Sequence, residues 1–254
     1  MADIQEFNHG NVSDLPDASY FADLDIRDIV RQSIFTESPY GSLSVFDLPD
    51  NPDVLLRSCR AGALVEDKVQ VMTTALQHFA VLERLGLSVP DTRFFVVPYI
   101  DPYAESLEYQ EVYAFTRRIA GQTLDTVTQN KAHFVSRLTD MLGEYFLWTL
   151  TSGETDDVFP DHTRTVNFMV SDPNDRNTTI WAHDVDPQIM PVREDNDYGL
   201  DMKCSVAEVF ELSRGVPFKL RPKSIRKALR IVEPLPYRVV RAIAGPMYRE
   251  KFKG

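Results

Sequence analysis

The residues best suited to chemistry lie between Phe159 and Pro187. The pattern predicts an acidic loop, a short strand that starts at Asn167, a polar turn, and a second strand that ends in the acidic pair Asp184 and Asp186. Because a strand–turn–strand unit brings its two ends together, we expect Asn167 and Asp184 to approach each other. Amide and carboxylate oxygens are the ligands that magnesium prefers, and magnesium in turn carries phosphates. The competing interpretation is an exposed hairpin whose ends are simply polar.

Length and composition are those of an ordinary globular protein. The chain has 254 residues, of which 43% are hydrophobic and 26% are charged, enough for one large domain or two lobes. No apolar run reaches the length of about 18 residues that predicts a membrane span. The acidic start of the chain lacks the apolar segment of a secretory signal. Cys59 and Cys204 lie far apart in the sequence, and we expect both to be free thiols in a cytoplasmic protein.

The charge is unevenly distributed along the chain. Residues 216–254 contain 11 Lys or Arg and two acids, a balance of +9, and because the whole chain carries −11, residues 1–215 carry −20. An acidic body repels nucleic acid, which argues against DNA or RNA as a partner. The basic C-terminal helices either pack on the core with a solvated face or contact an anionic surface or a protein.

The predicted elements that position these residues change character along the chain. Residues 1–32 are polar and acidic, and we expect a loosely packed arm. Strands are predicted at 33–37, 43–48, 54–59, 93–100 and 112–119, with a long amphipathic helix at 64–85 that Gly86 stops. A second apolar helix over 132–151 is expected to be the core of a second, mainly helical lobe. The fold class expected is α+β, with an N-terminal antiparallel sheet.

The order of these elements resembles the protein-kinase-like fold, and it is closest to the aminoglycoside and choline phosphotransferase branch of small-molecule kinases. The segment LERLGLSVPDTRFFVV resembles the helix of that branch followed by a Val-Pro step into the fourth strand. The segment YAFTRRIAGQTL resembles its hinge, where a strand ends and a G-x-x-L motif opens the second lobe. The resemblance implies two lobes, residues 33–117 and 118–254, and ATP and Mg²⁺ as cofactors.

The resemblance also implies a role for residues of the first lobe. The loop at Tyr40, Gly41 and Ser42 would lie over the nucleotide, and Arg117 belongs to the hinge that receives it. Where the family has a phosphate-binding lysine on the third strand, this chain has Arg57, which keeps the charge but not the geometry of an ammonium. Where the family has a helix acid paired with that lysine, counting back from Val-Pro gives Gln77. The competing interpretation of Arg57 is a solvated charge at a strand end.

The catalytic loop of such kinases has an Asp, an Asn five residues later, and a hairpin that ends in a metal-binding Asp. Asn167 and Asp184 match the last two positions, with Asp186 as a further oxygen ligand. His162 stands five residues before Asn167 and Asp161 six before, so either could accept the proton of the acceptor. Arg164 would help to neutralise the transferring phosphoryl group.

Three functions are compatible with these residues. The first is an ATP- and Mg²⁺-dependent phosphotransferase acting on a hydroxyl of an unidentified small molecule or protein. The second is a pseudokinase, a nucleotide- or partner-binding protein without catalysis, which the altered positions at Arg57, Gln77 and Asp161 favour. The third is a hydrolase with a transition metal bound by histidines and acids, namely His162, His183, Asp184 and Asp186; adjacent residues on a strand face opposite ways, which disfavours it.

Overall fold

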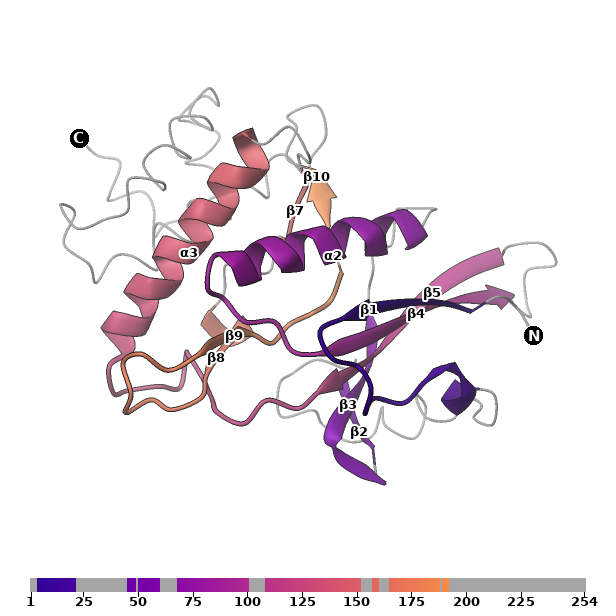
Figure 1. Cartoon of the computed structure of the whole chain (residues 1–254), viewed down its shortest axis with the longest axis horizontal. Helices are drawn as coiled ribbons and strands as arrows, with labels where there is room; N and C mark the ends of the chain where they lie inside the picture. The colour runs from indigo at the N-terminus through magenta and orange to yellow at the C-terminus, as the bar shows by residue number, and fades with distance from the viewer. Residues whose placement is uncertain are drawn as a thin grey trace, which may run out of the picture. The chain divides into compact units, whose positions relative to one another are not determined.

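The computed structural model describes residues 4–21, 45–48, 50–59, 68–100, 108–151, 157–159, 165–187 and 189–191. The expected strand at 33–37 and the basic segment 216–254 lie outside the described residues. The described elements confirm the α+β class, with antiparallel sheets and two long helices (Figure 1). They divide between two compact units, the first formed by Met1–Phe79, Pro90–Ile119 and Val185–Gln188 and the second by Ala80–Val89, Ala120–Asp184 and Ile189–Gly254.

The first unit contains a five-stranded antiparallel sheet in the order β1-β4-β5-β3-β2. Its centre is the long β4–β5 ladder, which runs in unbroken register from Thr92↔Thr116 to Ile100↔Glu108. The central strands β4 and β5 have consecutive buried residues, Phe94–Val96 and Val112–Phe115, the pattern of strands that are covered on both faces. The strands are β1 (Gln5–His9), β2 (Val45–Leu48), β3 (Asn51–Cys59), β4 (Thr92–Ile100) and β5 (Glu108–Arg117).

The N-terminal segment belongs to this sheet, which corrects the expectation of a loosely packed arm. β1 pairs with β4 from Gln5↔Val96 to His9↔Thr92. Beyond β1, Leu15 is 4% exposed and belongs to the hydrophobic core, and a short 3₁₀ helix, η1, covers Ala18–Phe21. The polar composition was misleading because an edge strand needs only one neighbour and buries few side chains.

The two faces of the sheet are covered differently. On one face, Phe46, Leu56 and Phe115 form a core with Leu15, and Tyr20 packs edge-on against Phe115 at 5.0 Å between ring centroids. The other face holds helix α2 (Lys68–Arg84), where Phe79 stacks on Phe94 of β4 at 6.1 Å and contacts His9 of β1 at 5.3 Å. The apolar stripe predicted for this helix therefore covers the sheet.

Helix α2 ends where the sequence predicts. Gly86 has a φ of +90°, its N–H donates to the Glu83 carbonyl at 2.9 Å, and the Leu87 N–H donates to the Leu82 carbonyl at 3.1 Å. This pair of hydrogen bonds is a Schellman motif, which needs a residue in the left-handed conformation after the last turn. The prediction that Gly86 stops the helix is confirmed.

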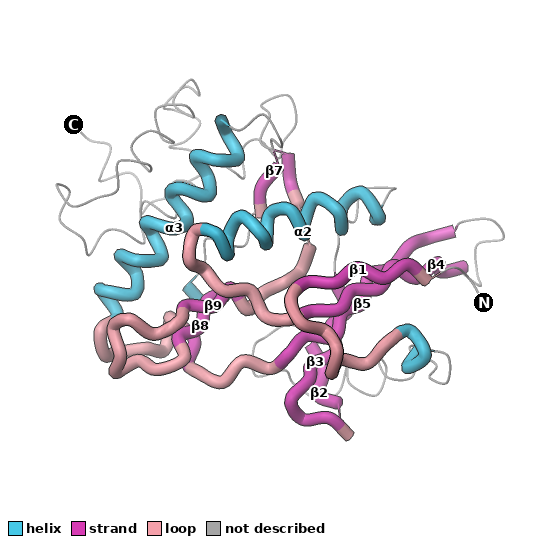
Figure 2. The backbone as a smooth tube through the Cα atoms, viewed as in Figure 1, coloured by secondary structure: helices cyan, strands magenta, loops and turns pink. Residues whose placement is uncertain are grey.

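The second unit is built around helix α3 (Lys131–Thr151), shown with its neighbours in Figure 2. Its buried side chains recur at helical spacing, at Phe134, Leu138, Leu142 and Tyr145, which confirms the predicted core helix. None of the helices in the described residues is long and apolar enough to cross a membrane. The remaining elements are β6 (Gln122–Thr123), β7 (Asp157–Val158), η3 (Thr165–Asn167), β8 (Phe168–Val170), β9 (Ile180–Ala182) and β10 (Met190–Pro191), which form sheets β6-β8-β9 and β10-β7.

Candidate functional site

The candidate site lies at the open end of the β8–β9 hairpin. The two strands pair from Val170↔Ile180 to Phe168↔Ala182, and beyond them the His183 N–H donates to the Asn167 carbonyl at 3.1 Å. Asp184 follows His183 directly, so the hairpin brings Asn167 and Asp184 to the same end, as predicted. The strand begins one residue later than expected, because residues 165–167 form the 3₁₀ turn η3.

Asn167 and Asp184 are both half-buried at this end. Every residue of β8 is buried, and Asp184 stands between His183 and the fully buried Val185. A carboxylate beside a buried apolar strand is costly unless it meets a cation or hydrogen-bond donors. This placement favours a functional or network role for Asp184 over the interpretation of a solvated hairpin end. Asp186 is also half-buried and belongs to the first unit.

His183 has a structural contact that bears on the transition-metal alternative. Its Nε2 lies 2.7 Å from the Val166 carbonyl oxygen. A carbonyl only accepts, so Nε2 carries the hydrogen and donates it. This nitrogen holds the turn before β8 and is not available to a metal. Among the residues that the structure describes, no three His, Cys, Asp or Glu side chains come together as a metal site, and His162 lies outside them.

The closed end of the hairpin is fixed to the start of α3. Asn130, at a φ of 56°, stands directly before α3, and its carbonyl accepts the N–H groups of His133 and Phe134 in the first turn. Its side chain donates to the Pro173 carbonyl at 3.0 Å and accepts from Arg176 Nε at 3.0 Å. The sequence reading did not assign Asn130 a role in holding the hairpin.

A residue within α3 holds the same turn. Arg137 Nη1 donates to the carbonyls of Arg176 at 2.7 Å and Thr178 at 2.9 Å. Within the turn, Asp172 accepts the Asn174 N–H at 2.9 Å, the local bond that makes Asp a frequent turn residue. The hairpin therefore has a fixed closed end, and its open end projects from a rigid base.

Both edges of the hairpin are also paired. On one edge, β6 pairs with β8, and the Leu124 N–H donates to the Phe168 carbonyl at 2.8 Å. On the other edge, Ser88 exchanges hydrogen bonds with Ile180 at 2.9 Å and with Ala182 at 2.8 Å. The hairpin is thus the centre of a small sheet, which limits how far its open end moves.

Arg57 occupies a buried position in the first unit. It lies on β3 between Val45 and Ala114 and is 9% exposed. Ala114 is paired in turn with Phe94, whose ring packs on α2, so by alternation Arg57 is on the face of the sheet that α2 covers. The interpretation of a solvated strand-end charge is therefore wrong. Burying a guanidinium requires acceptors or an anion.

The helix position predicted to partner Arg57 faces the wrong way. Gln77 is exposed on α2, whereas His78 and Phe79 next to it are completely buried. The helical phase turns the Gln77 side chain to solvent. The sequence reading overlooked His78, which lies on the buried stripe with Ala75 and Leu82.

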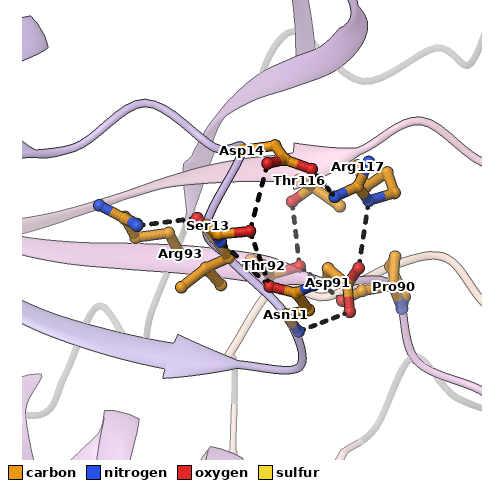
Figure 3. A network of polar contacts seen from close by, with 10 residues as sticks. Asn11, Ser13, Asp14, Pro90, Asp91, Thr92, Arg93, Thr116 and Arg117 are labelled. Atoms are coloured by element: carbon orange, nitrogen blue, oxygen red, sulfur yellow. Dashed lines mark hydrogen bonds and ion pairs between the residues drawn. The ribbon is translucent and has the colours of Figure 1, made fainter.

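Arg117 takes part in a polar network rather than presenting a free guanidinium (Figure 3). Its Nε donates to Asp91 Oδ2 at 3.1 Å, and its Nη2 lies 3.5 Å from Asp14 Oδ2. Asp91 Oδ1 accepts the Asn11 N–H at 3.0 Å. Arg93 adds a bond to the Val12 carbonyl at 2.8 Å. The network ties the segment after β1 to the ends of β4 and β5, a structural role that sequence reasoning did not assign to Arg117.

The other predicted site residues lie outside the described residues. These are Tyr40, Gly41 and Ser42 of the expected nucleotide loop, Asp161, His162 and Arg164 of the expected catalytic loop, and Cys204. Cys59, which is described, lies half-buried at the end of β3.

Comparison with protein-family models, with curated proteins and with solved structures found no match. Function must therefore be inferred from the chain's own residues, above all from the hairpin whose open end carries Asn167 and Asp184.

Proposed function

We propose that this chain is an ATP- and Mg²⁺-dependent phosphotransferase that transfers the γ-phosphate to a hydroxyl acceptor. The observation that carries the proposal is the open end of the β8–β9 hairpin. There the His183 N–H donates to the Asn167 carbonyl at 3.1 Å, so the backbones of Asn167 and of the residue before Asp184 lie side by side. Hard oxygen donors that lie at one end of a rigid hairpin are what a magnesium–phosphate site needs.

The donor set fits magnesium in its chemistry. Asn167 and Asp184 supply an amide oxygen and a carboxylate, and Asp186 supplies a further carboxylate in the proposed set. Bound magnesium would neutralise the charge of the nucleotide phosphates. The buried Arg57 would contact phosphate as a fixed cation. Asp161 or His162 would accept the proton of the hydroxyl, with Arg164 beside them.

The order of elements along the chain supports a kinase-like, two-lobed architecture. The described strands β2 and β3 precede α2, strands β4 and β5 follow it, and Gly121 comes before the helix α3 and the β8–β9 hairpin. This is the succession on which the resemblance was based. The assignment of residues 33–117 and 118–254 to two kinase lobes is part of the proposal.

A binding protein on the same scaffold is the second candidate. The exposed Gln77 and the engagement of Arg117 by Asp91 and Asp14 favour it, because neither residue is then placed as a catalytic kinase would need it. In this case the nucleotide or a partner is bound without phosphoryl transfer. The basic residues 216–254 are the candidate contact for an anionic partner.

Thermal unfolding with and without Mg-ATP tests the nucleotide site. A ligand at 100 times its Kd stabilises by about 2.7 kcal/mol, which raises Tm by about 5–10 °C for a chain of this size. We expect this shift for the unaltered protein and its loss in Asn167→Ala and Asp184→Asn. Matched controls are Asn177→Ala and Asp125→Asn, which change exposed residues of the same types and should keep the shift.

Transfer of labelled γ-phosphate to a panel of hydroxyl compounds separates the two candidates. Transfer that Asp184→Asn abolishes supports the phosphotransferase. A Mg-ATP shift without transfer to any acceptor supports the binding protein. A shift that Asn167→Ala and Asp184→Asn leave intact means that the hairpin is not the site. The absence of both shift and transfer refutes the phosphotransferase and a nucleotide-binding role for the second candidate.

A further inference from the structure

Strand β1 is an edge of the five-stranded sheet. It pairs with β4 through five consecutive residues without a bulge, and within the described residues it has no strand on its other side. Gln5, Glu6 and Asn8 are exposed, and Phe7 is half-buried. An edge of this kind presents backbone N–H and C=O groups that a further strand can pair with.

The usual protections of an edge strand are missing from β1. Its sequence QEFNH contains no Pro and no Lys, and its register is regular. The single charge, Glu6, is already engaged, because Asn8 Nδ2 donates to its Oε1 at 3.0 Å and Arg93 Nε lies 3.6 Å from the same oxygen. Nothing in the strand therefore repels an added strand.

The strand is self-complementary when two copies run antiparallel about Phe7. In that alignment Phe7 faces Phe7 of the second copy, Glu6 faces Asn8, and Gln5 faces His9. No like charges are opposite each other, and the two Glu6–Asn8 pairs repeat across the interface the hydrogen bond that these side chains make within the strand. Aromatic and polar cross-strand pairs of this kind stabilise a sheet.

The proposed pairing also keeps each side chain on the same face of the joined sheet as in the single copy. Phe7 is paired with Phe94, so it lies on the face that α2 covers, where His9 contacts Phe79. Glu6 and Asn8 lie on the opposite face, beside Arg93. A two-fold axis perpendicular to the sheet at Phe7 keeps each residue facing a neighbour on its own side.

We propose that β1 is a homodimerisation edge, through which two copies of this chain join their sheets about a two-fold axis at Phe7. The interface is a ladder of five residues from each copy, well below the size of stable protein interfaces, so the dimer is weak and depends on concentration. The net charge of −11 on each copy opposes association, and salt screens that repulsion. The proposal is independent of the phosphotransferase function.

Sedimentation equilibrium of the full chain between about 10 μM and 1 mM, at about 0.15 M salt, tests the proposal. Asn8→Lys places an opposite charge against Glu6 of the second copy, and Asn8→Glu places a like charge there, twice in each dimer. With the magnitude of cross-strand pairs, we expect the dimer Kd to fall about 2- to 30-fold for Asn8→Lys and to rise by a similar factor for Asn8→Glu. Within one copy, Glu6 and Arg93 act on the new charge in opposite directions, so Tm at low concentration should change little.

Asn177→Lys and Asn177→Glu are the matched controls, because they change the net charge equally at an exposed position outside β1. Both control variants should change the dimer Kd only by the small amount that the altered net charge causes. Hydrogen exchange should show amides of residues 5–9 protected as concentration rises. A protein that stays monomeric to about 1 mM overturns the proposal. So do equal shifts from the two Asn8 variants, and so does β1 protection independent of concentration, which would assign the edge to a segment of the same chain.

Discussion

Replacing Gly121 by alanine should damage the base of the candidate site. Gly121 stands just before β6, at a φ of +156°, and a Cβ there would overlap the carbonyl oxygen of Val170 and lie 3.1 Å from its carbonyl carbon. Val170 is the residue of β8 that pairs with Gln122. The obstacle is backbone, so it cannot be relieved by turning a side chain.

The expected cost has two parts. A non-glycine residue at this φ costs about 1–3 kcal/mol, and the overlap with a paired strand costs about 1–3 kcal/mol more, as for other overpacked sites. Gly86→Ala separates the two parts, because Gly86 also has a positive φ of +90° but its Cβ would meet only Met141 Sδ at 3.7 Å. For Gly86→Ala we expect about 1–2 kcal/mol, the conformational cost alone.

Urea unfolding of both variants measures the difference, with the slope of the transition checked for a change in the unfolded state. Because β8 leads directly from Asn167, Gly121→Ala should also weaken Mg-ATP binding in the thermal-shift assay, whereas Gly86→Ala should not. If Gly121→Ala costs no more than Gly86→Ala, the backbone at Gly121 does not lie against the Val170 carbonyl of β8. The base of the hairpin is then less rigid than we infer.

Two further predictions concern the rest of the fold. Gly10→Ala should lower the free energy of unfolding by about 2–4 kcal/mol, because Gly10 has a φ of +72° and an added Cβ would overlap the Asp91 carboxylate. In the Asp91→Ala background this loss should be smaller by at least about 1 kcal/mol. Strictly additive free energies of unfolding in the double-mutant cycle would contradict this. Partial desolvation raises the pKa of Asp140 on α3, and the Glu144 carboxylate four residues later raises it further. The folded state therefore holds this proton more tightly, and the stability that it contributes is present below the unfolded pKa and lost as pH rises through the folded pKa. Asp140→Asn should thus stabilise the fold by a few tenths of a kcal/mol at pH 7, about the cost of a like-charge pair, and should have no effect near pH 3. The same stabilisation at both pH values, or the same stabilisation from the control variant Asp125→Asn, would show that the charge of Asp140 is not responsible.

The hairpin also explains why the candidate site depends on residues distant in the sequence. Asn130, directly before α3, and Arg137 of α3 hold its turn, and Ser88 holds its outer edge. None of them carries the proposed chemistry, yet each fixes the backbone from which Asn167 and Asp184 project. In proteins, precise ligand sites generally need such supporting contacts.

The sequence alone determined the features that depend on local pattern. The helical stripes predicted α2 and α3, Gly86 marked the end of α2, and runs of aromatic and β-branched residues separated by turns predicted β3, β4 and β5. The hairpin and the approach of Asn167 to the acidic end were also predictable, because a short turn between two strands leaves few other arrangements. These features need only neighbours within a few residues.

Only the tertiary structure decided the features that depend on partners far away in the chain. The polar segment QEFNH is a strand because β4 pairs with it, and no local signal carries that information. The burial of Arg57 follows from the packing of α2 over its face of the sheet, and the exposure of Gln77 follows from the helical phase that the same packing fixes. Arg117 is held by Asp91 and Asp14 because β1 brings the N-terminal segment back to the end of β5. Local pattern thus identified the candidate site residues, and contacts between distant parts of the chain decided which of these residues are buried, exposed or held in a polar network.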